Sequence, residues 1–181
     1  VEGQERLIPS CNNVVAEGMV IHTHSPRVRE ARRVNLRLLL SQHEIRCTKC
    51  TRSGNCRLQQ LANDYNLLGE HYIKDLRNIP TDFSNPVVRI ENRCVRCMRC
   101  VEVCNKIQGI GALRIDEIGT KAGVCLNGTK DWVDSTKCVR CGQCIMVCPT
   151  GALMSTDNVD KAREILEDES VISVVQFAPS V

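Results

Sequence analysis

The stretch Cys94–Cys104, CVRCMRCVEVC, and the stretch Cys138–Pro149, CVRCGQCIMVCP, decide how this chain folds. In each stretch three cysteines recur at every third position, and a fourth comes four residues after the third. Two-residue spacers let a looped backbone present three sulfur atoms to one small inorganic body, while the fourth thiolate faces another way. A repeated run with this spacing predicts two [4Fe–4S] clusters within one folded region.

The fourth cysteine of each run is expected to bind the cluster of the other run, as in ferredoxins with two clusters. The two ligand sets are named the second and third centres. The second centre comprises Cys94, Cys97, Cys100 and Cys148, and the third comprises Cys138, Cys141, Cys144 and Cys104. Two four-cysteine runs with the same spacing make zinc binding or disulfide bonds poor alternatives.

A further group of metal-binding side chains precedes both runs and is named the first centre. Its members are His43, Cys47, Cys50 and Cys56. One histidine and three cysteines form a common ligand set of structural zinc sites, so the spacing alone leaves zinc open. A third [4Fe–4S] cluster is favoured because it would extend an electron-transfer chain. A neutral imidazole ligand would also raise the reduction potential of such a cluster.

The composition is typical of a small domain stabilised by metal. The chain has 181 residues, 13 cysteines and only 3% aromatic residues, so metal binding is expected to supply part of the folding energy. The net charge of +3 gives no indication of nucleic-acid binding. No segment has the apolar length of a signal peptide or a membrane span, and closely paired cysteines suit a reducing compartment. A cytoplasmic protein is therefore expected.

The ends of the chain predict a fragment of a longer protein, because it begins without Met and stops after an apolar stretch. Between them, the pattern predicts an α+β fold of short elements. Ser25 and Pro26 should begin a helix that ends near Ser41. The other expected elements are a strand or hairpin over 14–23, a helix over 57–72, a strand over 87–91, strands at Gly111–Leu113 and Gly151–Leu153, a hairpin turn at Asn127–Gly128, a helix over 159–167 and a strand over 171–177.

The first predicted helix has an apolar side and a basic side. The apolar side is expected at Val28, Ala31, Asn35, Leu38 and Leu39, with Leu36 and Leu40 beside it. Arg29, Arg33 and Arg37 recur every four residues and form a basic ridge. The ridge is interpreted as a solvated helix face, and the alternative is a docking edge for an acidic partner.

The remaining histidines and cysteines lack the spacing of metal ligands. His22, His24 and His71 are expected to be ordinary surface or packing residues. Cys125, between Val124 and Leu126, is expected to be a small buried apolar residue. Cys11 stands alone near the N-terminus.

The order of these motifs resembles the N-terminal part of [FeFe]-hydrogenases. A module with one histidine and three cysteines precedes two ferredoxin-type runs and a helix, and Ser173–Ser180, SVVQFAPS, is similar to the first strand of the hydrogenase catalytic domain. The chain is most similar to the large subunit of NAD(P)-linked, multi-subunit enzymes, including electron-bifurcating ones. The cysteine motifs alone are shared with large subunits of NADH:quinone oxidoreductases and with NAD-dependent formate dehydrogenases.

This resemblance implies an anaerobic oxidoreductase that interconverts protons and hydrogen, of which these residues form the electron relay. It implies partner subunits that carry flavin, NAD(P) and a [2Fe–2S] centre, and exchange with soluble ferredoxin. Cys11 would be the last ligand of a plant-type [2Fe–2S] domain. That cluster and the catalytic H-cluster are expected only in the complete chain, so no residue here is expected to be catalytic.

The resemblance also implies an order of domains. A remnant of the [2Fe–2S] domain is expected over 1–24, the first-centre module over 25–79, the two-cluster ferredoxin-like domain over 87–156 and the start of the truncated catalytic domain over 157–181. The alternatives are the relay of a formate dehydrogenase or of a complex I-like subunit, and a stand-alone ferredoxin-like carrier. A zinc-binding structural module is the weakest alternative.

Overall fold

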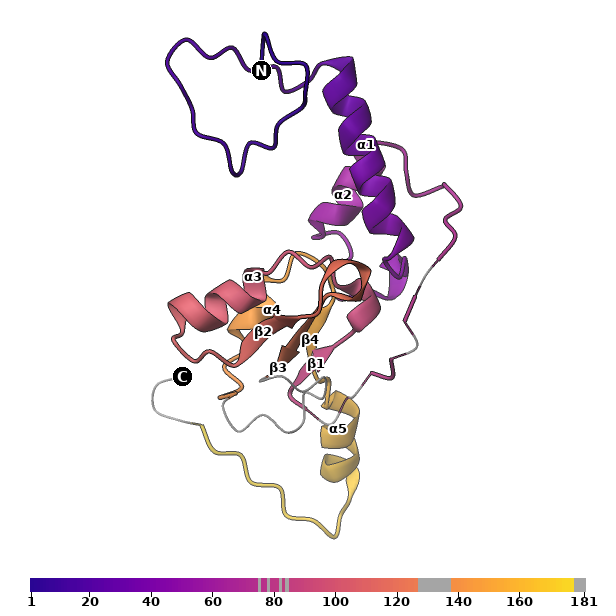
Figure 1. The fold of residues 1–181 in the computed structure, drawn as a ribbon. Coiled ribbons are helices and arrows are strands. Elements are labelled where there is room, and N and C mark those ends of the chain that lie inside the picture. The colour runs from indigo at the N-terminus through magenta and orange to yellow at the C-terminus, as the bar shows by residue number, and fades with distance from the viewer. Residues whose placement is uncertain (75, 78, 82, 84, 127–137, 178–181) are drawn as a thin grey trace. The chain divides into compact units, whose positions relative to one another are not determined.

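The computed structural model describes residues 1–74, 76, 77, 79–81, 83, 85–126 and 138–177 (Figure 1). They form two compact units, each made from separate stretches of the chain. The first unit comprises residues 1–79, 90–97 and 149–152, and the second comprises residues 80–89, 98–148 and 153–181. Short helices and short strands both occur, as the expected α+β class requires.

Helix α1, Pro26–Ser41, has the predicted bounds. Ser25 is extended and its hydroxyl accepts a hydrogen bond from the Val28 N–H at 3.4 Å, while Pro26 stands where no donor is needed. The buried side of α1 is not centred where the sequence pattern predicted it. Leu38 and Leu39 are exposed, whereas the two residues placed beside that side, Leu36 and Leu40, are buried.

The core of the first unit joins α1 to α2, Arg57–Asp64. Its buried members are Leu36, Leu40, Leu58, Ala62 and Leu67. Helix α2 ends at Asp64 and not at residue 72 as predicted, because Asn66 adopts a φ of 53° and turns the chain. The Leu67 N–H then donates to the Ala62 carbonyl at 2.8 Å, and the Leu67 side chain enters the core.

Truncation of Leu40 should destabilise the first unit strongly. Leu40 is 1% exposed, so Leu40→Ala should lower the free energy of unfolding by about 2–5 kcal/mol through lost contacts and the cavity left behind. Leu38→Ala on the same helix is the matched control, because Leu38 is 63% exposed and its truncation should change stability by less than about 0.5 kcal/mol. Urea unfolding followed by circular dichroism measures both, and equal losses would contradict the packing of α1.

Two antiparallel pairs of strands form the sheets of the second unit. Strand β1, Val87–Arg89, pairs with β4, Leu153–Ser155, and β2, Leu113–Asp116, pairs with β3, Gly123–Leu126. The strand expected over 87–91 is confirmed at reduced length. The strands after the two cysteine runs begin at the leucine of each Gly-Ala-Leu sequence.

Short helices follow the cysteine loops of both runs. Helix α3, Arg99–Glu102, continues into a π-helical turn, Val103–Ile107, and α4 spans Gln143–Val147. Helix α5, Val159–Glu167, has the predicted bounds. Apart from the cysteines of the two runs, the buried apolar residues of the second unit are Val87, Val88, Val101, Ala112, Leu113, Val124, Cys125, Leu126 and Leu153.

Two predicted strands are not found among the residues that the structure describes. Residues 14–23 contain no strand, and Gly18 lies in a turn with a φ of 75°. Residues 171–177 are exposed and form no strand, since no described strand pairs with them. The hairpin turn predicted at 127–128 lies outside the described residues. Within the described part of the chain, no helix is long and apolar enough to cross a membrane.

Candidate iron–sulfur centres

The four predicted ligands of the first centre line one cavity in the first unit. His43 follows the end of α1, Cys47 begins the short 3-10 helix Cys47–Lys49, and Cys50 follows that helix. Cys56 is the residue before α2. The packing of α1 against α2 therefore brings the first and last members of this group together, although 13 positions separate them in sequence.

The electrostatics around His43 suit a neutral imidazole ligand. Burial, assisted by the positive charges of Lys74 and Arg93, lowers the pKa of His43 from 6.5 to about 4. Its Nδ1 atom is buried and has no hydrogen-bond partner among the described residues. A neutral ring with an unpartnered nitrogen fits the form in which histidine binds metals.

Ionisation of the Cys47 thiol in the first centre is disfavoured while no positive charge is present. Burial raises the pKa of Cys47, and the nearby sulfurs of Cys50 and Cys56 raise it further. Three thiolates cannot gather in a half-buried site without a compensating cation, because each charge disfavours the next. Iron would supply that positive charge, so the donor set fits a metal cluster.

The wall of the first cavity is completed by residues from distant parts of the sequence. The Glu44 N–H donates to the Asn92 carbonyl at 2.7 Å, and the buried Arg93 donates from Nε to Glu44 at 3.2 Å. The Thr150 hydroxyl donates to the Arg93 carbonyl at 2.8 Å. Beside it, Gly151 lines the cavity, and a methyl group at Gly151 would overlap the sulfur of Cys50.

A second cavity, in the second unit, is lined by the four predicted ligands of the third centre. These are Cys104, Cys138, Cys141 and Cys144. Cys104 belongs to the first run and lies in the π-helical turn, whereas the other three belong to the second run. Burial raises the pKa of Cys144 to about 11, and the sulfurs of Cys138 and Cys141 add to that effect. The same argument for a compensating cation therefore applies here.

The ligands proposed for the second centre come from both runs of cysteines. Cys94, Cys97 and Cys100 belong to the first run, and Cys148 belongs to the second. Cys100 and Cys148 are buried, and the sulfur of Cys94 accepts a hydrogen bond from the Arg96 N–H at 3.4 Å. The assignment of these four cysteines to one cluster stays a prediction from the sequence.

The two cysteine loops share a backbone geometry that suits an anionic cluster. Arg96 and Met98 in the first run have φ values of 55° and 61°, and the equivalent Arg140 and Gly142 have values of 56° and 74°. Left-handed residues in such a series aim successive N–H groups at one point, which forms a concavity for an anion. Only one of the four is glycine, so each of the others costs about 1–3 kcal/mol, a strain that a bound group can offset.

The ligands predicted for the first and third centres each line one cavity. Among the described residues, no group of three or more His, Cys, Asp or Glu side chains is found that could hold a single metal ion.

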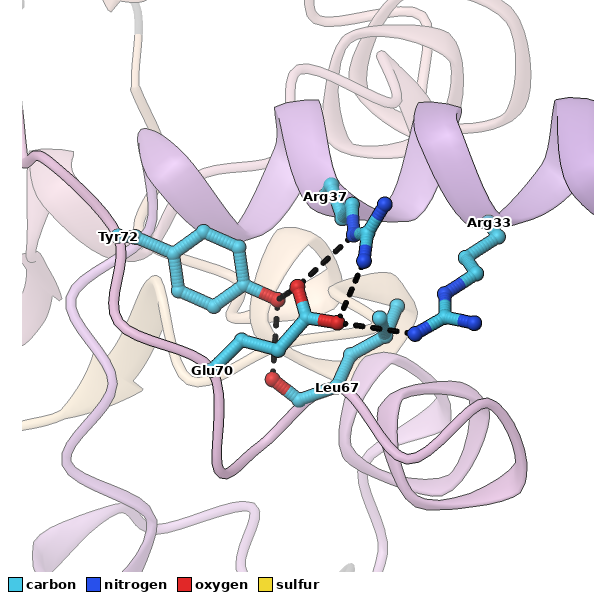
Figure 2. Close-up of polar contacts among 5 residues, drawn as sticks. All are labelled: Arg33, Arg37, Leu67, Glu70 and Tyr72. Atoms are coloured by element: carbon cyan, nitrogen blue, oxygen red, sulfur yellow. Dashed lines mark hydrogen bonds and ion pairs between the residues drawn. The ribbon is translucent and has the colours of Figure 1, made fainter.

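A polar network outside the cavity connects α1 to the segment after α2 (Figure 2). Glu70 accepts hydrogen bonds from Arg37 at 2.8 and 2.7 Å and from Arg33 at 3.1 Å. Arg33 and Arg37 of the predicted basic ridge are therefore bound by a carboxylate of the same chain, so a fully solvated ridge was wrong for these two. The i, i+4 spacing of the arginines is one signal for this pairing, but no pattern in the sequence identifies Glu70.

The network predicts an acid-sensitive contribution to stability. Arg37, with help from Arg33, lowers the pKa of Glu70 from 4.5 to about 2. The ion pairs therefore stabilise the fold fully above about pH 4.5, and this stabilisation is lost as the pH falls towards about 2. Glu70→Gln should lower the urea midpoint at pH 7, and the difference from the parent should shrink below about pH 4.5. The parent and Glu70→Gln have the same cysteines, so any release of iron by acid should affect both proteins alike. A difference between their urea midpoints that does not change with pH would contradict the prediction.

The other histidines and cysteines lie as follows. His22, His24 and His71 are exposed, as expected for surface residues. Cys125 is 2% exposed and its thiol lies 3.7 Å from the Arg114 carbonyl, which confirms the expectation of a small buried residue. Cys11 is exposed, and its role as a [2Fe–2S] ligand stays a prediction.

Two family models match the parts of the chain that contain these cavities. Residues 32–70 match the NADH-ubiquinone oxidoreductase-G iron-sulfur binding region. Residues 93–152 match the 4Fe-4S dicluster domain. The chain thus carries a 4Fe–4S binding region of the NADH-G type followed by a dicluster ferredoxin-like domain.

Curated relatives of this chain belong to multi-subunit oxidoreductases. The chain is 38% identical over its whole length to the NADP-reducing hydrogenase subunit HndD of Solidesulfovibrio fructosivorans, of which it covers 31%. Over 90% of its length it is 36% identical to a subunit of the NADH-quinone oxidoreductase of Rhizobium meliloti, of which it covers 19%. The chain therefore spans less than a third of these relatives.

A solved structure shares the fold of most of the chain. It is the crystal structure of the NAD+-reducing [NiFe]-hydrogenase in the H2-reduced state, with a TM-score of 0.65 and 26% identity over 73% of this chain and 56% of that chain. Together with the family matches, this likeness shows that the chain is homologous to the iron–sulfur regions of NAD(P)-linked hydrogenases and complex I-like oxidoreductases.

Proposed function

We propose that this chain is an electron relay that holds three [4Fe–4S] clusters. The observation that carries the proposal is that each of two separate cavities is lined by four ligands chosen from the sequence. The first centre would use His43, Cys47, Cys50 and Cys56, and the third would use Cys104, Cys138, Cys141 and Cys144. The second would use Cys94, Cys97, Cys100 and Cys148, in keeping with the crossed ligation of dicluster domains.

In this relay the chain binds, orients and shields its clusters. A bound [4Fe–4S] cluster takes up and releases one electron at a time. Buried apolar neighbours such as Leu40 and Leu58 line the first cavity beside the half-buried cysteines and limit the access of water. Backbone N–H groups such as that of Arg96, which donates to the sulfur of Cys94, draw electron density from the ligands and so influence the reduction potential.

The parent protein is proposed to be the large subunit of an NAD(P)-linked [FeFe]-hydrogenase. The match of the whole chain to part of an NADP-reducing hydrogenase supports this, as does the resemblance of residues 173–180 to the start of a hydrogenase catalytic domain. Under this proposal residues 1–24 are the end of a [2Fe–2S] domain that includes Cys11, and residues 25–79 form the first-centre module. Residues 87–156 form the two-cluster domain, and residues 157–181 are the start of the catalytic domain.

The partners of the parent protein would be flavin- and NAD(P)-binding subunits and ferredoxin, with electron bifurcation as one mode of operation.

A complex I-like large subunit is the second candidate. The match of residues 32–70 to the NADH-G region and the relative in Rhizobium meliloti favour it. Both candidates use the chain as a relay and differ in what lies at its end. They are therefore separated by the activity of the complete polypeptide and not by the residues of the relay.

The complete natural polypeptide, purified without oxygen, should oxidise hydrogen with a viologen as electron acceptor. Iron and sulfide analysis of the same preparation should show the clusters of the relay intact. Hydrogen oxidation would support the hydrogenase. A full complement of clusters without hydrogen oxidation would favour the complex I-like protein, and a preparation with zinc in place of iron and sulfide would overturn the relay itself.

A further inference from the structure

Lys74 reaches the main chain at the first centre from a segment that the ligand pattern does not include. Its ammonium nitrogen donates to the Leu40 carbonyl at 2.5 Å and to the His43 carbonyl at 2.9 Å. Leu40 lies in the last turn of α1, where its carbonyl also accepts from the N–H groups of Gln42 and His43 and where a positive charge is favourable. One cation therefore bridges the end of α1 and the main chain of the proposed histidine ligand.

The surroundings of Lys74 suit a charged ammonium group. Its nitrogen lies 5.0 Å from the centre of the Tyr72 ring, within the range of a cation–π interaction. Two carbonyl oxygens and a ring face all attract positive charge, and an ammonium group has three N–H donors to serve them. The side chain is exposed, and its ammonium group is held by these three contacts.

The polar network of Figure 2 fixes this arrangement from the other side. The Tyr72 hydroxyl donates to the Leu67 carbonyl at 2.9 Å and lies 3.4 Å from Glu70, which Arg33 and Arg37 hold in turn. Leu67 is a core residue of the first unit. The Tyr72 ring against which Lys74 lies is consequently held by the core and the polar network of the first unit.

We propose that Lys74 is a positioning residue that fixes the main chain of His43 and raises the reduction potential of the first centre. The inference rests on the proposed function, because it requires a redox cluster at His43. Reduction adds one negative charge to the cluster, and a fixed positive charge nearby stabilises the reduced form more than the oxidised form. The imidazole ligand and Lys74 would act in the same direction, since each would raise the reduction potential of the first centre.

The test is an anaerobic redox titration of the complete protein, monitored by electron paramagnetic resonance. The first centre is identified by the nitrogen coupling of its histidine ligand in pulsed spectra. Lys74→Gln keeps an N–H donor but removes the charge, and should shift the midpoint potential of this centre to lower values. Lys74→Arg should restore the potential, and Lys161→Met, which removes an exposed charge from α5 in the other unit, should leave it unchanged.

Each outcome bears on one of the two proposals. If the parent protein shows no nitrogen-coupled cluster, the ligand set and the proposed function of the first centre fail. If the parent shows that cluster and its potential is the same in Lys74→Gln, the inference on Lys74 fails while the relay stands. Lys74→Met serves as the second neutral variant if Lys74→Gln does not assemble, and a neutral variant with the parent's potential overturns the inference.

Discussion

Replacement of Cys104 by alanine should remove the cluster of the downstream cysteine run and leave the cluster of its own run in place. Cys104 lines the cavity that contains Cys138, Cys141 and Cys144. Loss of one of four ligands from a buried site leaves an iron atom without a protein partner, and metal-binding energy is folding energy in such domains. The iron content should fall by about four atoms from about twelve. The cluster signal that disappears from the electron paramagnetic resonance spectrum should be the one that also disappears in Cys141→Ala.

A matched control is available in a cysteine outside every proposed ligand set. Cys125 is 2% exposed, so Cys125→Ala removes a buried sulfur without removing a ligand and should leave the iron content unchanged. Cys97→Ala should remove a different resonance from that lost in Cys104→Ala. If both variants lose the same resonance, each run binds its own cluster and the crossed assignment is wrong.

Gly151→Ala should disrupt the first centre although Gly151 binds no metal. The added methyl group would overlap the sulfur of Cys50, with the Thr51 hydroxyl only 3.5 Å from the same methyl position. A cysteine that is bound to a cluster cannot rotate away, so the chain near Gly151 or the cluster must shift. Overpacking of this kind costs about 1–3 kcal/mol, and we expect loss of the nitrogen-coupled resonance together with about four iron atoms.

Gly69→Ala is the control for the effect of a methyl group in the same unit. Nothing lies within 4 Å of a methyl group at Gly69, and its φ is not in the left-handed region. Gly69→Ala should therefore retain all iron and the resonance of the first centre. Full iron content in Gly151→Ala, with an unchanged resonance, would show that the segment 149–152 does not approach Cys50 as closely as the structure indicates.

Local signals allowed part of this fold to be predicted. A hydroxyl followed by proline marked the start of α1 because both features act within one turn, and the polar residues before Val159 marked the start of α5, where Asp157 accepts from the Val159 N–H at 3.0 Å. The predicted ligands of two centres line common cavities. Short-range cysteine spacing grouped most of them, and the crossed ligation of two-cluster ferredoxins grouped Cys104 with the second run. Gly111 and Gly151 each begin a Gly-Ala-Leu sequence after a cysteine run, but the two glycines have different structural roles. Gly111 adopts a φ of 67°, whereas Gly151 serves a close approach to Cys50.

The contacts that the sequence did not predict are those between residues distant along the chain. Glu70 lies 33 positions from Arg37, and Lys74 lies 31 positions from His43, so neither pairing produces a periodic pattern. The buried side of α1 was misplaced for the same reason. Leu36 and Leu40 are buried because α2 and Leu67 pack there, and the position of α2 depends on the turn at Asn66.

The composition of the first unit has a consequence for the order of events during synthesis. Its ligands are made early, but residues 149–152, which supply Gly151 to the cavity wall, are added 70 positions after residue 79. At about 5–20 residues per second the ribosome needs roughly 4–14 s for that interval. During this time the nascent chain carries His43, Cys47, Cys50 and Cys56 without the last part of their enclosure. Iron delivered to the first centre before residue 152 is made would meet an open site, so stable loading of this centre is expected to be a late step in the maturation of the polypeptide.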